Sequence, residues 1–178
     1  MFDSSVFWLN CALVSLLLGT ALLVPLGLVF PENRFRLSRG AVVGGAALFW
    51  PGFALVMIQT MWQSYYVYFY PFWMKWALLL IAAGFFPGMA FAFHWLACRL
   101  PGHPLGWFCL FAGLQSVAEH TIAWMSGLAE KVPSLHGAPL IPVLTFAFFE
   151  YQIYWAIALW LAWVISKLRN RRKTERAF

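Results

Sequence analysis

Apolar residues follow one another along this chain in long blocks that polar residues interrupt at only a few places. Each block exceeds the roughly 20 residues that an α-helix needs to cross the hydrocarbon core of a bilayer. The blocks cover residues 6–30, 40–62, 72–100, 105–129 and 140–166. The pattern predicts an all-α fold: a polytopic integral membrane bundle of five transmembrane helices that forms one domain. A basic tail over residues 167–178 should follow it, solvated and partly disordered.

Small residues cluster in the second predicted helix, where Gly40, Gly44 and Gly45 precede Ala46 and Ala47. Such spacing lets two helices approach closely, either within one chain or between membrane proteins. The first five residues contain no Lys or Arg. They therefore lack the basic region of a signal peptide, and we expect the first helix to be retained.

Composition strengthens the membrane assignment. Hydrophobic residues make up 63% of the chain, charged residues only 10%, and the mean hydropathy is +0.75. Soluble domains carry about 25% charged residues. Aromatic residues reach 20%, with 11 Trp, and many fall near predicted helix ends. This is typical of interfacial belts and bundle packing, with an aromatic-lined ligand pocket as the alternative.

The net charge of +6 is a topology signal rather than a sign of nucleic-acid binding. In a five-span chain, ten of the twelve basic residues fall on one side of the membrane, and Lys75 and Lys131 fall on the other. The ten are Arg34, Arg36, Arg39, Arg99, Lys167, Arg169, Arg171, Arg172, Lys173 and Arg176. We therefore expect the N-terminus outside and the C-terminus in the cytoplasm of a cell membrane of the bacterial inner-membrane type.

Ionisable residues inside the predicted spans mark the candidate site. Glu119 and His120 lie in the fourth span, and Glu150 lies in the fifth. Each Glu lies ten residues from the outer end of its predicted span, which is about 15 Å along a helix. Both carboxyl groups should therefore lie at one depth. Ionisable groups in a membrane span are costly and usually functional, so these three residues are the candidate catalytic residues. The alternative is a structural hydrogen-bonded network or an ion pair that joins the fourth and fifth helices.

Three further residues are candidates for binding a ligand or cofactor: Tyr154, Trp124 and Gln115. Helical spacing places Gln115 one turn before Glu119, Ser116 one turn before His120, and Tyr154 one turn after Glu150. More distant residues that could join from the outer half are His136, Gln59 and Asn10. His94 and His103 fall towards the cytoplasmic side, at another depth.

A divalent metal ion is a candidate cofactor, with Glu119, His120, Glu150 and His136 as ligands. Two Glu and two His residues would suit zinc or iron. However, adjacent helical residues diverge by about 100°, so Glu119 and His120 converge poorly on one ion. Haem is less favoured still, because His94 and His120 lie at different depths. Three cysteines, without a C-x-x-C motif, do not indicate a disulfide framework.

The leading functional hypothesis is a small membrane protein that handles an ion or a small hydrophobic molecule at this Glu/His site, with a proton relay. One alternative is a membrane-embedded acid/base enzyme, of isomerase or hydratase type, acting on an isoprenoid, sterol or lipid. Another is a non-catalytic accessory subunit of a larger membrane complex. Expected partners are the lipid bilayer, other membrane proteins or further copies of the chain, and no nucleic acid. No phosphate-binding, zinc-protease or nucleophile-elbow motif is present.

Overall fold

The computed structural model describes residues 4–29, 37–64, 67, 71–132 and 135–175. These residues form five long helices and one short helix. In chain order the helices are α1 (Ser4–Val29), α2 (Arg39–Met61), α3 (Met74–Ala97), α4 (Pro104–Met125), α5 (Leu128–Lys131) and α6 (Leu140–Glu175). The all-helical prediction is confirmed.

Four of the described helices are long and apolar enough to cross a membrane, namely α1, α2, α3 and α6. The fourth long helix, α4, has 22 residues but is not among them. Gln115, Glu119 and His120 lie close together in α4 and lower its mean hydropathy. The chain is thus compatible with a multi-pass membrane protein.

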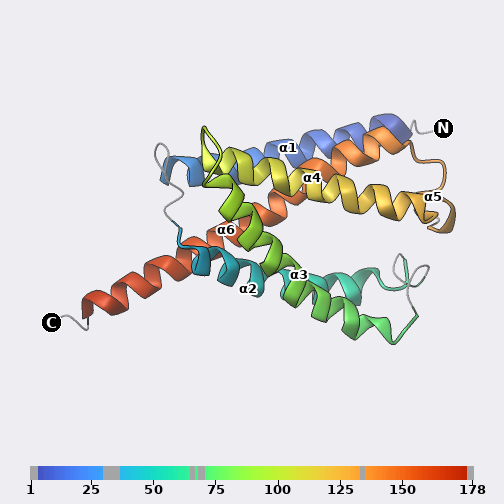
Figure 1. The fold of residues 1–178 in the computed structure, drawn as a ribbon. Coiled ribbons are helices and arrows are strands. Elements are labelled where there is room, and N and C mark those ends of the chain that lie inside the picture. Colours follow the sequence, from blue (N-terminus) through green and yellow to red (C-terminus); the bar gives the residue numbers. More distant parts are fainter. Residues whose placement is uncertain (1–3, 30–36, 65–66, 68–70, 133–134, 176–178) are drawn as a thin grey trace.

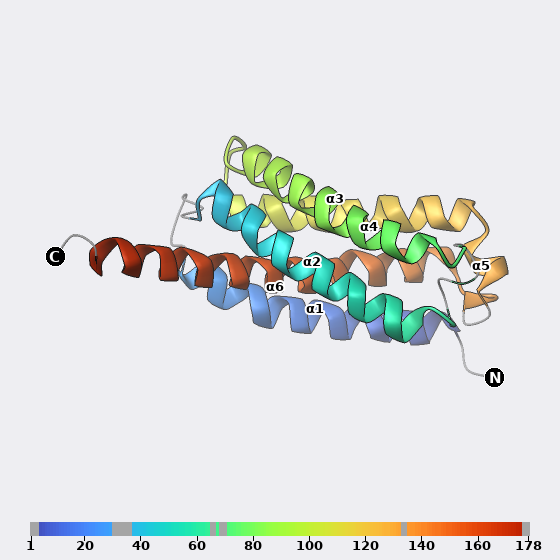
Figure 2. The same cartoon turned by 90° about the horizontal axis from the view of Figure 1, so that it is seen from below.

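Successive long helices run in opposite directions along the bundle (Figures 1 and 2). One end, here called the N-side, holds the start of α1, the α2–α3 connection and α5. The other end, the C-side, holds the start of α2, the α3–α4 connection and the end of α6. Arg39 and Arg99 lie at the C-side, whereas Lys75 and Lys131 lie at the N-side. Arg34 and Arg36 lie outside the described residues.

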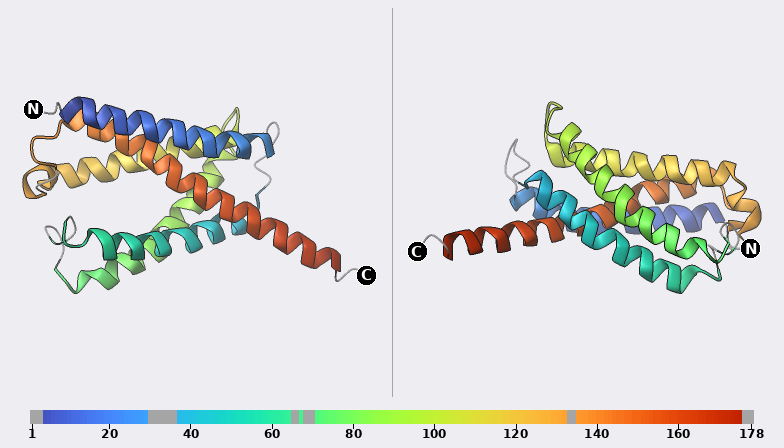
Figure 3. Two further views of the ribbon diagram at one scale, coloured as in Figure 1. Left: turned by 180° about the vertical axis from the view of Figure 1, so that it is seen from behind. Right: turned by 60° about the horizontal axis from the view of Figure 1, so that its bottom comes forward.

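The longest helix, α6, is the centre of the bundle. It packs against α1, α2 and α4, while α3 packs against α2 and α4. Towards the N-side, the α2–α3 pair diverges from the layer formed by α1, α4 and α6 (Figures 1 and 3). The two groups meet most closely where α2 crosses α6.

Gly45 makes the α2–α6 crossing possible. A Cβ atom at this position would lie 2.3 Å from the Ala158 carbonyl oxygen and 2.9 Å from the Ala162 Cβ. Only glycine permits this approach, since the neighbouring atoms include backbone that cannot move aside. The prediction of a close helix contact is confirmed at Gly45, and the contact is within the chain. Gly40 has no such neighbour within 4 Å.

Aromatic side chains fill the core next to this crossing. Trp50 of α2 stacks on Phe86 of α3, with ring centroids 3.8 Å apart and planes 8° apart. Trp155 of α6 packs against Trp50 at 5.3 Å and against Phe108 of α4 at 5.5 Å. Trp50, Phe108 and Trp155 are all almost fully buried. A large share of the aromatic residues therefore serves bundle packing.

Two predictions about helix ends were wrong. The fourth helix ends at Met125 rather than near residue 129, because Gly127 adopts φ +86°, in the left-handed region that ends a helix. The tail continues α6 as helix to Glu175 rather than losing regular structure. Lys and Arg are good helix formers, and the preceding helix removes the cost of starting a new one.

Candidate functional site

Glu119 has a hydrogen-bond donor at each of its carboxylate oxygens. The Gln115 amide Nε2 donates to Oε1 at 2.8 Å, from one turn earlier on α4. The Tyr151 hydroxyl of α6 donates to Oε2 at 2.6 Å. Glu119 is half-buried. The predicted Gln115–Glu119 pair is confirmed, and the second bond ties α4 to α6.

Tyr151 was not among the predicted site residues. Its position next to Glu150 was visible in the sequence, but a residue beside an acid on a helix points about 100° away from it. Which of the two faces α4 depends on the rotation of α6 about its axis. In the structure, the Tyr151 hydroxyl meets the Glu119 carboxylate.

Glu150 is half-buried on α6 and receives a hydrogen bond from the Tyr154 hydroxyl, as its spacing predicted. The His120 imidazole of α4 lies 6.0 Å from the Tyr151 ring, between centroids. The rings of Tyr151 and Tyr154 are 5.7 Å apart, so the two Glu–Tyr pairs lie beside each other. The site therefore contains two carboxyl groups, two phenols and one imidazole from two helices.

The local contacts of His120 indicate its tautomer. His120 Nδ1 lies 2.9 Å from the Ser116 carbonyl oxygen and 3.3 Å from the Ser116 hydroxyl, which confirms the predicted pairing. A carbonyl oxygen only accepts, so we assign the proton of the neutral imidazole to Nδ1. Nε2 is then the ring nitrogen that can accept a proton.

Aromatic side chains of α2 form a wall of the site. Phe53 lies 4.4 Å from the Tyr154 ring, between centroids. Trp50 lies 5.6 Å from the Tyr151 ring and 6.0 Å from the Tyr154 ring. The predicted site joins α4 and α6, and the structure thus adds α2 as a third contributor.

Three buried polar atoms near this cluster lack a hydrogen-bond partner among the described residues. They are Trp50 Nε1, Trp155 Nε1 and Gln115 Oε1. A buried polar group without a partner costs about 1–3 kcal/mol. Two donors and one acceptor are therefore available to a polar group or a water molecule that enters the aromatic core.

Other predicted site residues lie apart from this cluster. Asn10 is exposed on α1, Gln59 lines a separate pocket, and His136 is exposed before α6. None of these three makes a hydrogen bond to Glu119, His120 or Glu150 in the described chain. Trp124 packs against Val132 and Leu135 at the N-side.

The remaining histidines have structural partners. His94 is buried, and its Nε2 donates to the Leu37 carbonyl oxygen at 3.0 Å. His103 accepts a hydrogen bond from the Leu105 amide and caps the start of α4. Both lie towards the C-side, as expected.

The described part of the chain contains no group of side chains that converges to hold a metal ion. No three or more His, Cys, Asp and Glu side chains gather there as ligands for one ion. Glu119 and Glu150 each receive a tyrosine hydroxyl instead. Cys11, Cys98 and Cys109 are free thiols.

The arrangement suits proton chemistry at a carboxyl–phenol pair. No family model, curated protein or solved structure matches this chain. The geometry of the site is consequently the basis for assigning a function.

Proposed function

We propose that this chain is a membrane protein that handles a proton-coupled ion or a small hydrophobic molecule at the cluster formed by Glu119, His120, Glu150, Tyr151 and Tyr154. One observation carries the proposal: each of two carboxyl groups on neighbouring helices receives a tyrosine hydroxyl, with an imidazole beside one of the two tyrosines. Ionisable groups in membrane spans are usually functional rather than structural.

The proposal includes α4 as a fifth span, with the N-terminus outside and the C-terminus in the cytoplasm. Two features support it: α4 lies alongside the other long helices, and its polar residues Gln115 and Ser116 are buried in the bundle. Arg39, Arg99 and Lys167 belong to the C-side, which supports a cytoplasmic C-side by the excess of basic residues. A bacterial inner membrane is the location we propose.

In the proposed mechanism, the cluster holds and moves one proton. Two carboxylates that are near each other in a medium of low dielectric repel, so a shared proton or cation stabilises the pair. Tyr151 and Tyr154 can pass a proton between the two carboxyl groups, because a phenol both donates and accepts. His120 Nε2 supplies a further acceptor.

A membrane-embedded acid/base enzyme is the second candidate, favoured by the aromatic wall. Trp50 and Phe53 lie beside the two tyrosines, and aromatic rings near a site can attract a developing cation on a lipid-soluble substrate. The free Trp50 indole N–H could bind an oxygen of that substrate. The same residues would then act as general acid and base.

Proton flux into vesicles tests the leading proposal. Purified protein is reconstituted into liposomes that contain a pH-sensitive dye, and a pH gradient is imposed. The wild-type chain should dissipate the gradient faster than empty vesicles, and Glu119→Gln and Glu150→Gln should abolish the difference while remaining folded. Glu130→Gln is the matched control, because Glu130 is exposed on α5.

Two results would count against proton handling. One is a wild-type rate equal to that of empty vesicles. The other is an unchanged rate in both Glu119→Gln and Glu150→Gln. In either case, screening lipid-soluble substrates for conversion by the wild type and these variants would test the enzyme hypothesis.

A further inference from the structure

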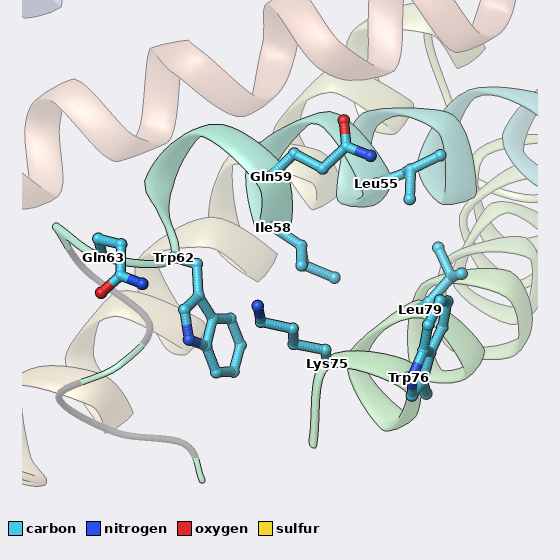
Figure 4. Close-up of a pocket in the computed structure, with 8 residues that line it drawn as sticks. All are labelled: Leu55, Ile58, Gln59, Trp62, Gln63, Lys75, Trp76 and Leu79. Carbon is cyan, nitrogen blue, oxygen red and sulfur yellow. The ribbon is translucent and has the colours of Figure 1, made fainter. Parts of the chain in front are cut away.

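A second polar location lies at the N-side, between the end of α2 and the start of α3. A pocket of about 340 Å³ opens there, away from the carboxylate cluster (Figure 4). Leu55, Ile58 and Leu79 form apolar walls, and Gln59, Trp62 and Lys75 also line it. This volume is at the lower end of the range for small-molecule sites and suits a single head group rather than a whole lipid.

Lys75 places a positive charge in this pocket without an acidic partner. Its Nζ lies 4.6 Å from the centroid of the Trp62 ring and 4.2 Å from that of Phe72. Figure 4 shows the amine between the Trp62 and Ile58 side chains. No ion pair between Lys75 and a carboxylate occurs within the described residues. The charge is thus held by ring faces and remains available to an anion.

Lys131, the other N-side lysine, provides the comparison. Its Nζ donates to the Ser126 carbonyl oxygen at 2.9 Å, within the short α4–α5 segment. It does not line the pocket. Among the described residues of the N-side, Lys75 is therefore the lysine whose ammonium group lies in an apolar cavity.

The surroundings of the pocket indicate a lipid environment. Phe72, Trp73 and Trp76 are largely exposed around the start of α3. Aromatic side chains exposed at the end of a membrane helix are typical of the depth of the lipid head groups. At that depth, a phosphate group can reach Lys75 while acyl chains lie against exposed apolar residues such as Leu55.

We propose that this pocket binds an anionic phospholipid of the N-side leaflet. The phosphate group binds the Lys75 ammonium, and an acyl chain follows Leu55 and Leu79. The inference rests on the membrane placement of α2 and α3 and is independent of the carboxylate cluster. Neither loss nor retention of proton flux in the Glu119 and Glu150 variants would bear on lipid binding at this pocket.

The test measures lipid binding to the full chain. Purified protein is placed in nanodiscs of phosphatidylcholine with or without a fixed fraction of phosphatidylglycerol, and bound lipid is counted by native mass spectrometry after release. Wild-type protein should retain phosphatidylglycerol selectively. Lys75→Gln should lower the selectivity by about fivefold, the effect of one basic residue near anionic lipid. Lys75→Arg should preserve it.

Three controls make the outcome decisive. Lys131→Gln should leave the selectivity unchanged, and equal loss in both lysine variants would overturn the site. Circular dichroism checks that each variant is folded. Inorganic phosphate is added in a separate arm: if it displaces the lipid fully at low millimolar concentration, the pocket recognises a free anion and the lipid proposal is wrong. Equal retention by wild type and Lys75→Gln also overturns it.

Discussion

Polar side chains in the α4–α6 cluster have partners within the chain, whereas the Lys75 charge in the α2–α3 pocket has none of opposite sign among the described residues. In the cluster, both oxygens of Glu119 have donors, and Glu150 has the Tyr154 hydroxyl. In the pocket, Lys75 has two aromatic faces and no acidic partner in the described chain. The comparison indicates that the cluster is organised by the chain itself, whereas the pocket is arranged to meet a group from outside.

The packing of α6 explains the difference. It contacts α1, α2 and α4, and the polar residues of α4 are buried (Gln115, Ser116) or half-buried (Glu119, His120) in the bundle. The α2–α3 pair diverges from this layer towards the N-side (Figure 3), where the end of α2 and the start of α3 line a pocket between them. Polar groups at those ends consequently have few partners within the chain.

Breaking the α2–α6 crossing should have the largest effect, since it joins the two regions. We expect Gly45→Ala to destabilise the protein by about 3 kcal/mol, at the upper end of the range for overpacking, because the new methyl group meets backbone atoms of α6. Equilibrium unfolding in detergent measures this. Gly40→Ala is the control and should change stability little, since nothing lies within 4 Å of Gly40.

Removing the Tyr151 hydroxyl should show how much more stability a hydrogen bond between two helices contributes than one within a single helix. Tyr151→Phe deprives Glu119 of a donor and should cost about 2 kcal/mol, as hydrogen bonds to charged groups do. Tyr154→Phe should cost less, because its bond to Glu150 lies within α6 and survives separation of the helices.

A double-mutant cycle checks the first of these bonds. Tyr151→Phe and Glu119→Gln are measured singly and together by the same unfolding assay. Groups in contact show coupling energies of about 0.5–3 kcal/mol. Additive effects would mean that the α4–α6 bond contributes nothing to the assembled bundle.

His94 tests whether a buried histidine outside the cluster has a purely structural role. His94→Phe removes the bond to the Leu37 carbonyl and should cost about 1 kcal/mol. Proton flux in vesicles should be unchanged, in contrast to Glu119→Gln. A flux lost together with normal stability would bring His94 into the functional site.

The last prediction concerns which end of the bundle faces the cytoplasm, and its experiment should not change the stability of the protein. Cys98 follows α3 at the C-side and is exposed, yet partial burial of its thiol raises the pKa, with the nearby Arg39 charge opposing the rise. A membrane-impermeant maleimide should label Cys98 from the cytoplasmic side only. Because the thiolate reacts and the pKa is raised, the rate should still increase about tenfold per pH unit around pH 8 and level off only above the raised pKa.

Labelling is followed by gel shift in right-side-out and inverted vesicles, with Cys98→Ser as the control. Labelling from outside would reverse the orientation of the bundle. It would also place the lipid pocket on the cytoplasmic side.

Contacts within one helix followed from sequence spacing. The bonds of Gln115 to Glu119, Ser116 to His120 and Tyr154 to Glu150 each span four residues, and the helical period fixes such neighbours whatever the helix packs against. The early end of α4 was missed because Gly127 ends the helix through its backbone conformation. An apolar pattern does not report that conformation.

The pattern of residues was enough to predict long apolar helices, their approximate positions and the ionisable residues that interrupt them, because helix length and polarity are local properties. Tertiary structure decided that Tyr151 faces Glu119, that α2 adds Trp50 and Phe53, and that Gln59 joins Lys75 in a pocket instead of the cluster. The physical reason is that the sequence does not fix the rotation of each helix about its own axis. How each helix is turned about its axis depends on close contacts such as that at Gly45, which form only when distant segments pack together.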